Sequence, residues 1–227
     1  MLAASVISCG FLLLGSGSCI HILRRHSFER YSRLLPQFVW ATIGIMATGT
    51  RSFNILTYAL LEKTYPIDPQ SLYLGNTDDL TAGRSALDIS CATTSIGALV
   101  YSLYLHHGHH VLGLCIFFLL VFLELFCNPR SRGIHRLRVP YWSSYIRKMI
   151  GIANAHRYAL CILFGGILGL VERNHLSLFG HLSYAVTALW FPSQSYSDGM
   201  TMRRVIENYT MLTYILLMTE ALRSSPS

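Results

Sequence analysis

Long apolar runs constrain this chain more than any motif in it. Two of them, residues 87–105 and 111–126, stand on either side of a turn that contains four histidines. Their apolar residues form continuous blocks without a 3.6-residue period, so each helix would be hydrophobic on every side. A helix needs about 20 mostly apolar residues to cross a hydrocarbon layer about 30 Å thick. The two runs therefore predict a central membrane hairpin from Leu87 to Phe126.

The composition extends this prediction to the whole chain. Of the 227 residues, 52% are hydrophobic and 13% are charged, whereas soluble domains carry about 25% charged residues. Because the apolar blocks leave no room for a separate soluble domain, we predict one integral-membrane domain, residues 1–227. Its fold class would be all-α, a multi-pass transmembrane bundle of six or seven helices. The remaining blocks are residues 2–23, 38–61, 149–171, 175–191 and 205–222.

Arg51 makes the number of membrane spans uncertain, because it lies near the middle of the block from Phe38 to Leu61. A cation at that depth costs about 2.5 kcal/mol or more on insertion scales. If this block does not span, six helices remain, and the cationic segments share one face with the tetra-histidine turn opposite. That arrangement agrees better with the bias of cations towards one side of a membrane. Seven spans, with the basic segments on opposite faces, is the alternative.

The segment after the central hairpin is the most basic part of the chain. Sixteen of the eighteen cations are arginines, and a guanidinium grips phosphate in a planar fork; codon bias would give the same excess. Cations with amphipathic aromatics suit a layer of anionic lipid head groups. We expect a phospholipid such as cardiolipin here and no nucleic acid, because the cations lie on no folded reading element. The predicted lipid-binding residues are Arg130, Arg132, Arg136, Arg138, Trp142, Arg147 and Lys148.

Within the predicted membrane blocks, Arg51 and Glu124 are candidates for an ion pair. Charges in a bilayer normally pair or line a path, so the pair would be a structural clamp or part of a proton or ion route. The other carboxylates near these blocks, Glu172, Glu207 and Glu220, lie near predicted helix ends and are expected to be ordinary interface residues.

The tetra-histidine turn is the candidate metal site, with His106, His107, His109 and His110 as ligands. Neutral imidazoles bind zinc, copper or iron, but a site needs further ligands and an orienting outer shell. The alternative is a wet interfacial turn, which we favour. Haem would need paired histidines deep in the membrane, and only His181 is deep. We therefore expect no zinc or haem, and we expect the six cysteines to be buried thiols.

Gly165 and Gly169 form a small-xxx-small ridge that would let another helix approach closely. The chain contains no nucleophile elbow, zincin helix or phosphate-binding loop, so the strong sequence signatures of an enzyme are missing and a non-enzymatic role is favoured.

These features predict a structural, accessory subunit of a larger membrane complex, associated with the respiratory chain or ATP synthase. Its partners would be membrane lipids and the other membrane subunits of a hetero-oligomer. The basic charge and the arginine excess favour the mitochondrial inner membrane, and an endomembrane is the alternative. Two other functions stay open. One is a small transporter or proton channel using Arg51 and Glu124, and the other is a metal-dependent lipid-modifying enzyme using the histidine turn.

Overall fold

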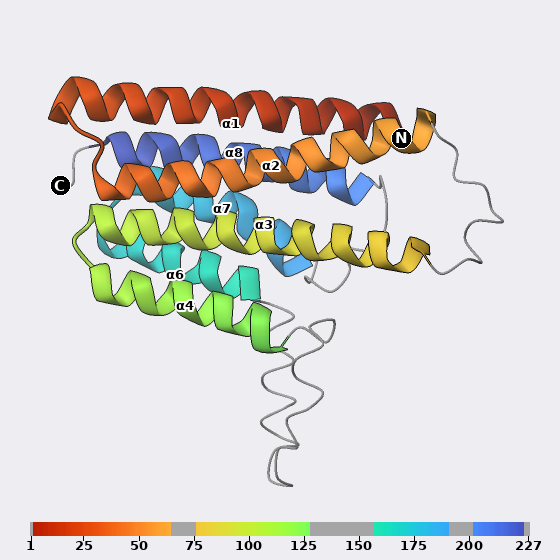
Figure 1. The fold of residues 1–227 in the computed structure, drawn as a ribbon. Coiled ribbons are helices and arrows are strands. Elements are labelled where there is room, and N and C mark those ends of the chain that lie inside the picture. The colour runs from red at the N-terminus through yellow and green to blue at the C-terminus, as the bar shows by residue number, and fades with distance from the viewer. Residues whose placement is uncertain (1, 65–75, 128–156, 191–201, 225–227) are drawn as a thin grey trace, which may run out of the picture.

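The computed structural model describes residues 2–64, 76–127, 157–190 and 202–224. In these ranges the chain is all-helical, as the sequence predicts, and its seven helices lie side by side in one bundle (Figure 1). In chain order they are α1 (Leu2–Tyr31), α2 (Pro36–Thr64), α3 (Asn76–His106), α4 (His110–Cys127), α6 (Arg157–Val171), α7 (His175–Trp190) and α8 (Met202–Arg223).

Several helices extend beyond the apolar runs that predict them. α1 continues past Leu23 to Tyr31, and on this extension Arg25 pairs with Glu29 at 2.6 Å, one helical turn away. α3 begins at Asn76, inside the segment of residues 62–85, whose polar composition and breakers predict a surface loop or a short helix opening at Asp78 or Thr81. Several of the residues added to α1 are polar and exposed, as at Arg24, Arg25 and Glu29.

Three tight turns and the end of α8 lie together at one end of the bundle, which we call the turn end (Figure 1). The turns follow α1, α3 and α6, and each contains one residue in the left-handed region: Ser32, Gly108 and Arg173, with φ of 52°, 83° and 53°. Successive helices therefore run in opposite directions. The arginines of the α1–α2 turn and the tetra-histidine turn share this end, whereas the six-span arrangement placed them on opposite faces.

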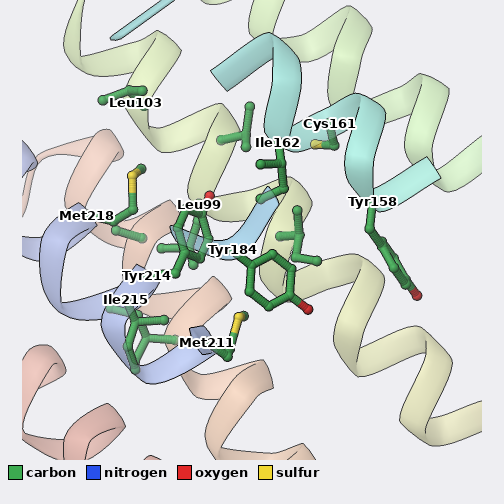
Figure 2. Packing of buried hydrophobic residues seen from close by; sticks show 14 of the residues in the cluster. Leu99, Leu103, Tyr158, Cys161, Ile162, Tyr184, Met211, Tyr214, Ile215 and Met218 are labelled. Atoms are coloured by element: carbon green, nitrogen blue, oxygen red, sulfur yellow. The ribbon is translucent and has the colours of Figure 1, made fainter. Parts of the chain in front are cut away.

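The two arms of the central hairpin occupy different positions. α3 packs against α2, α4, α6 and α8, and almost every side chain from Cys91 to Tyr104 is buried. α4 packs mainly against α3 and more lightly against α6. The centre of the bundle is an apolar cluster in which α3, α6, α7 and α8 meet (Figure 2). Its members include Leu99, Ile162, Tyr184, Tyr214 and Met218.

The outer surface of the bundle is largely apolar, including the middle segments of the helices, although Ser18, Thr50 and Thr213 are also exposed there. Each of the seven exposes large hydrophobic side chains, of which Leu14, Phe53, Leu87, Phe118, Ile167, Phe179 and Leu216 are examples. The middle segments contain only two charged residues, Arg51 and Glu207, and both are buried. These segments are residues 6–23, 38–57, 90–105, 111–123, 158–171, 176–189 and 205–219.

By length and composition alone, one helix within the described ranges could cross a membrane, Val6–Tyr31. Two shorter apolar helices, His110–Leu123 and Tyr158–Val171, fall below the length required.

Candidate functional site

A buried ion pair joins α2 to α8. Arg51 Nη1 donates to Glu207 Oε1 at 2.8 Å, and the two residues are 6% and 5% exposed. The desolvation of both charges is offset only while the pair is intact, because removing one partner leaves a buried charge without compensation. The pair therefore holds α2 and α8 in a fixed relation.

Further polar side chains surround this pair between α1, α2, α3 and α8. Asn208 Nδ2 donates to Ser8 Oγ at 3.0 Å, which connects α8 to α1. The hydroxyls of Thr48 and Ser95 share a short hydrogen bond, which connects α2 to α3. We call this set the polar interior; its members are Ser8, Thr48, Arg51, Ser52, Ser95, Glu207 and Asn208, all buried.

The structure gives Arg51 a partner that the sequence analysis assigned elsewhere. The expectation that Glu207 is an ordinary interface residue is wrong, because α8 begins at Met202 and turns this carboxylate into the bundle. The predicted partner, Glu124, has a side chain outside the described part of the structure. No sequence signal links Arg51 to a residue so far along the chain.

Histidines at the turn end connect three segments that are distant in sequence. His109 Nε2 donates to Glu172 Oε1 at 2.9 Å, and His107 Nδ1 lies 3.6 Å from Glu172 Oε2. His106 Nε2 donates to the carbonyl oxygen of Ser224 at 3.1 Å. The α3–α4 turn is thereby tied to the α6–α7 turn and to the end of α8. We call the contact of His107 and His109 with Glu172 the histidine tie.

Burial lowers one pKa in this tie and a hydrogen bond lowers the other, so both groups favour the deprotonated form. Burial lowers the pKa of His107, although the nearby Glu172 carboxylate acts to raise it. The hydrogen bond from His109 lowers the pKa of Glu172. Neutral His107 and ionised Glu172 are therefore the forms that the folded chain favours.

The four histidines of the turn do not converge on one point. His106 is directed to α8, His107 and His109 contact Glu172, and His110 is exposed. Within the described ranges, no group of three or more His, Cys, Asp or Glu side chains has an arrangement that could hold a metal ion.

His181 forms a separate histidine site, buried in the bundle. The sequence predicts only that this histidine lies deep within a membrane block. Its Nδ1 donates to the carbonyl oxygen of Ser177 at 2.7 Å, so its Nε2 can accept from the Tyr214 hydroxyl at 3.3 Å. Tyr214 in turn stacks against Tyr184, with ring centroids 5.7 Å apart, and both tyrosines lie in the central cluster (Figure 2). Both ring nitrogens of His181 are thus engaged by protein groups.

Gly165 and Gly169 lie where α6 meets α7. A Cβ on Gly165 would overlap the His181 imidazole, and one on Gly169 would lie 2.9 Å from the backbone nitrogen of Leu178. The missing side chains therefore allow the close approach of the two helices that the small-xxx-small spacing predicts.

The remaining predictions concern the basic loop and the cysteines. The basic loop with Trp142 lies outside the described residues. Five cysteines in the described residues are free thiols: Cys9, Cys19, Cys91, Cys115 and Cys161. The expectation of burial is wrong for Cys115 on α4, which is exposed.

Comparison of the chain with known protein families, with curated proteins and with solved structures finds no match. The function is therefore inferred from the geometry above.

Proposed function

We propose that this chain is a multi-pass integral membrane protein that serves as a structural, accessory subunit of a larger membrane complex. We place it in the mitochondrial inner membrane, associated with the respiratory chain or ATP synthase.

The observation that carries this proposal is the distribution of polar and apolar side chains. In the middle of the bundle the exposed positions hold residues such as Leu14, Phe118 and Phe179, while the charges of Arg51 and Glu207 are buried. Water around these helices would favour the opposite distribution, because apolar surface is driven inside at about 25 cal/mol per Å². Hydrocarbon around them accounts for both features, since a charge in lipid must be buried and paired.

The same distribution explains why, among the described helices, one alone has the length and mean hydropathy of a membrane span. α2, α3 and α8 bury many of their polar groups, including Thr48, Arg51, Ser95, Glu207 and Asn208, which lowers their average hydrophobicity without placing a charge from their middle segments in lipid. Exposed hydroxyls also occur, and that of Thr213 bonds to a carbonyl oxygen of its own helix. The apolar part of α4 in the described residues, His110–Leu123, is shorter than a span, but the whole helix to Cys127 has 18 residues and measures about 27 Å at about 1.5 Å per residue. That length is close to the thickness of the hydrocarbon layer, about 30 Å.

A structural role agrees with how the ionisable groups of the interior are used. Arg51 binds Glu207, and His181 binds Tyr214 and Ser177. Each contact joins one helix to another or fixes a side chain within the core. Such satisfied contacts stabilise one packing arrangement, which is what an accessory subunit requires of its fold.

The basic loop supplies the expected lipid contact of this subunit. Its six cations and aromatic residues would bind the phosphates of an anionic lipid, and cardiolipin is the candidate in the mitochondrial inner membrane. The outward faces of α4 and α6, with Phe118, Leu119 and Ile167, would contact lipid chains or the helices of neighbouring subunits.

Fractionation followed by a native gel tests the proposal. The full chain should stay in the membrane pellet after alkaline carbonate extraction. In mild detergent it should then migrate only within a large complex, whose other chains can be identified by mass spectrometry. Release by carbonate would contradict the membrane assignment, and recovery as a stable monomer would contradict the role as a subunit.

The polar interior favours one second candidate, a small transporter or proton channel. Buried hydroxyl, amide and charged groups lie between four helices, and such groups in a membrane bundle are typical of ion paths. A proton-flux assay with purified chain in liposomes separates the two functions. A transporter predicts flux that Arg51→Gln abolishes, whereas a structural subunit predicts no flux above that of empty liposomes.

A further inference from the structure

The outer face of α1 changes character along its length. Ile7, Phe11 and Leu14 are all more than half exposed and are purely apolar. Further towards the turn end the exposed residues of α1 are polar or aromatic: Gly17, Ser18, His21, Arg24 and Arg25, followed by Phe28, Glu29, Arg30 and Tyr31. α1 lies at the edge of the bundle, where it packs mainly against α2 and α8 (Figure 1), so this stripe faces outward.

The arginines of this stripe are held at the surface by aromatic rings. The guanidinium carbon of Arg24 lies 6.0 Å from the centroid of the Phe28 ring, and that of Arg30 lies 5.7 Å from the centroid of Tyr31. An arginine over an aromatic face keeps its donors directed outward and is only weakly hydrated, which suits it for phosphate.

Hydrogen bonds made by Ser27 fix the conformation of the turn that follows α1. Ser27 Oγ donates to the carbonyl oxygen of Arg33 at 2.7 Å and accepts from the backbone nitrogen of Leu35 at 3.3 Å. Ser32 takes a left-handed conformation at this point. Arg33 is therefore placed next to the end of α1 and remains exposed.

The nearby carboxylates do not offset this charge. Among the described residues of the turn end, Glu29 is engaged by Arg25, Glu220 by Arg223 and Glu172 by His109. Each of these carboxylates is paired with a basic side chain near it, so the charges of Arg24 and Arg33 give this surface a net positive charge.

From this arrangement we propose that the outer face of α1 and the α1–α2 turn bind an anionic phospholipid. Arg24, Arg30 and Arg33 contact its phosphate, and its acyl chains lie along α1 past Ser18 and Gly17 as far as Leu14. Leu14 and Arg24 are separated by about 15 Å along a helix, which matches one leaflet of hydrocarbon about 30 Å thick in total. This inference rests on the proposed membrane location, and it assigns a lipid site distinct from the basic loop.

Native mass spectrometry of the full chain in neutral detergent tests the site. The probes are phosphatidylglycerol and phosphatidylcholine with identical acyl chains. The wild-type chain should retain more phosphatidylglycerol. The variant Arg24→Gln/Arg30→Gln/Arg33→Gln should bind it at least tenfold more weakly and bind phosphatidylcholine unchanged, because each cation near an anionic head group contributes about fivefold.

Single variants at the same end of the bundle provide a matched control. Arg24→Gln should weaken phosphatidylglycerol binding about fivefold, while Arg173→Gln, an exposed cation on the α6–α7 turn, should change it less than twofold. Equal losses in the two single variants, or an unchanged triple variant, would overturn the site while leaving the membrane assignment intact. A chain that stays soluble and monodisperse without detergent would overturn both.

Discussion

The two arms of the central hairpin, α3 and α4, differ in composition and in their position in the bundle. α4 is the more apolar arm and lies at the periphery with Val111, Phe118 and Leu119 exposed; α3 is richer in serine and threonine and lies at the centre with Thr93, Ser95 and Ser102 buried. In water, burial of apolar area would place the more hydrophobic helix inside. The reversed order is expected when the surroundings are as apolar as leucine and polar groups find their partners between helices.

The largest expected effect comes from breaking the charge pair that this interior contains. Arg51→Ala leaves the Glu207 carboxylate buried without its guanidinium partner, which costs about 3–5 kcal/mol. Thermal unfolding of the full chain in neutral detergent measures the loss. As a control, Arg24→Ala removes an exposed arginine and should change stability by less than about 0.5 kcal/mol. If Arg51→Ala were equally mild, the polar interior would not hold α2 against α8.

A charge on the outside of the peripheral arm should have the next largest effect. Phe118 is 59% exposed on α4, so Phe118→Lys would place an ammonium in hydrocarbon at a cost of about 2.5–3.5 kcal/mol. The measured quantity is the fraction of chain that resists alkaline carbonate extraction, which should fall. His110→Lys, at the turn, is the matched control and should leave this fraction unchanged. A fully tolerated Phe118→Lys would indicate that water, not lipid, faces α4.

A smaller effect tests how closely helices approach inside the bundle. Gly165→Ala would force its methyl group into the His181 imidazole, and such overpacking typically costs about 1–3 kcal/mol. The unfolding midpoint in detergent should fall accordingly. Gly17→Ala on α1, where no heavy atom lies within 4 Å of the added Cβ, should be neutral or slightly stabilising. Equal midpoints for the two variants would show that the α6–α7 contact is looser than the structure has it.

The smallest effect concerns the histidine tie at the turn end. Because burial lowers the pKa of His107 below its ordinary value of 6.5, the unfolded chain binds more protons, and stability falls as the pH drops below 6.5. The lowered pKa of Glu172 adds a loss further into acid, below its ordinary value of 4.5. His107→Gln should make the pH dependence between 6.5 and 5 shallower, and exposed His110→Gln should not. Identical slopes for both variants and the wild type would exclude His107 as a source.

The positions of the helices could be predicted well from sequence. Each apolar run is longer than the hydrophobic stretches found in surface loops, so the cores of all seven described helices coincide with predicted blocks, as in α4 and α7. Boundaries were less accurate where polar residues continue a helix. α1 extends through Arg24 and Arg25, where the Arg25–Glu29 ion pair supports the helix without any hydrophobic signal. α3 starts at Asn76, ahead of its apolar run.

The partners in the candidate site could not be predicted. Arg51 and Glu207 are brought together by the order in which helices pack, and composition does not record that order. The approach of His107 and His109 to Glu172 likewise depends on two turns sharing one end of the bundle. The close approach of some helix to α6 was easier to predict, since the spacing of Gly165 and Gly169 is a local signal, but the structure was needed to identify that helix as α7.

Spin-label accessibility on α4 tests the surroundings of the bundle most directly. A nitroxide placed at Cys115, which is exposed, with the other cysteines replaced, reports collisions with oxygen, which concentrates in lipid, and with a water-soluble nickel chelate. In reconstituted membranes the label should be relaxed strongly by oxygen and hardly at all by the chelate. Strong relaxation by the nickel chelate would place water against α4 and contradict the membrane bundle.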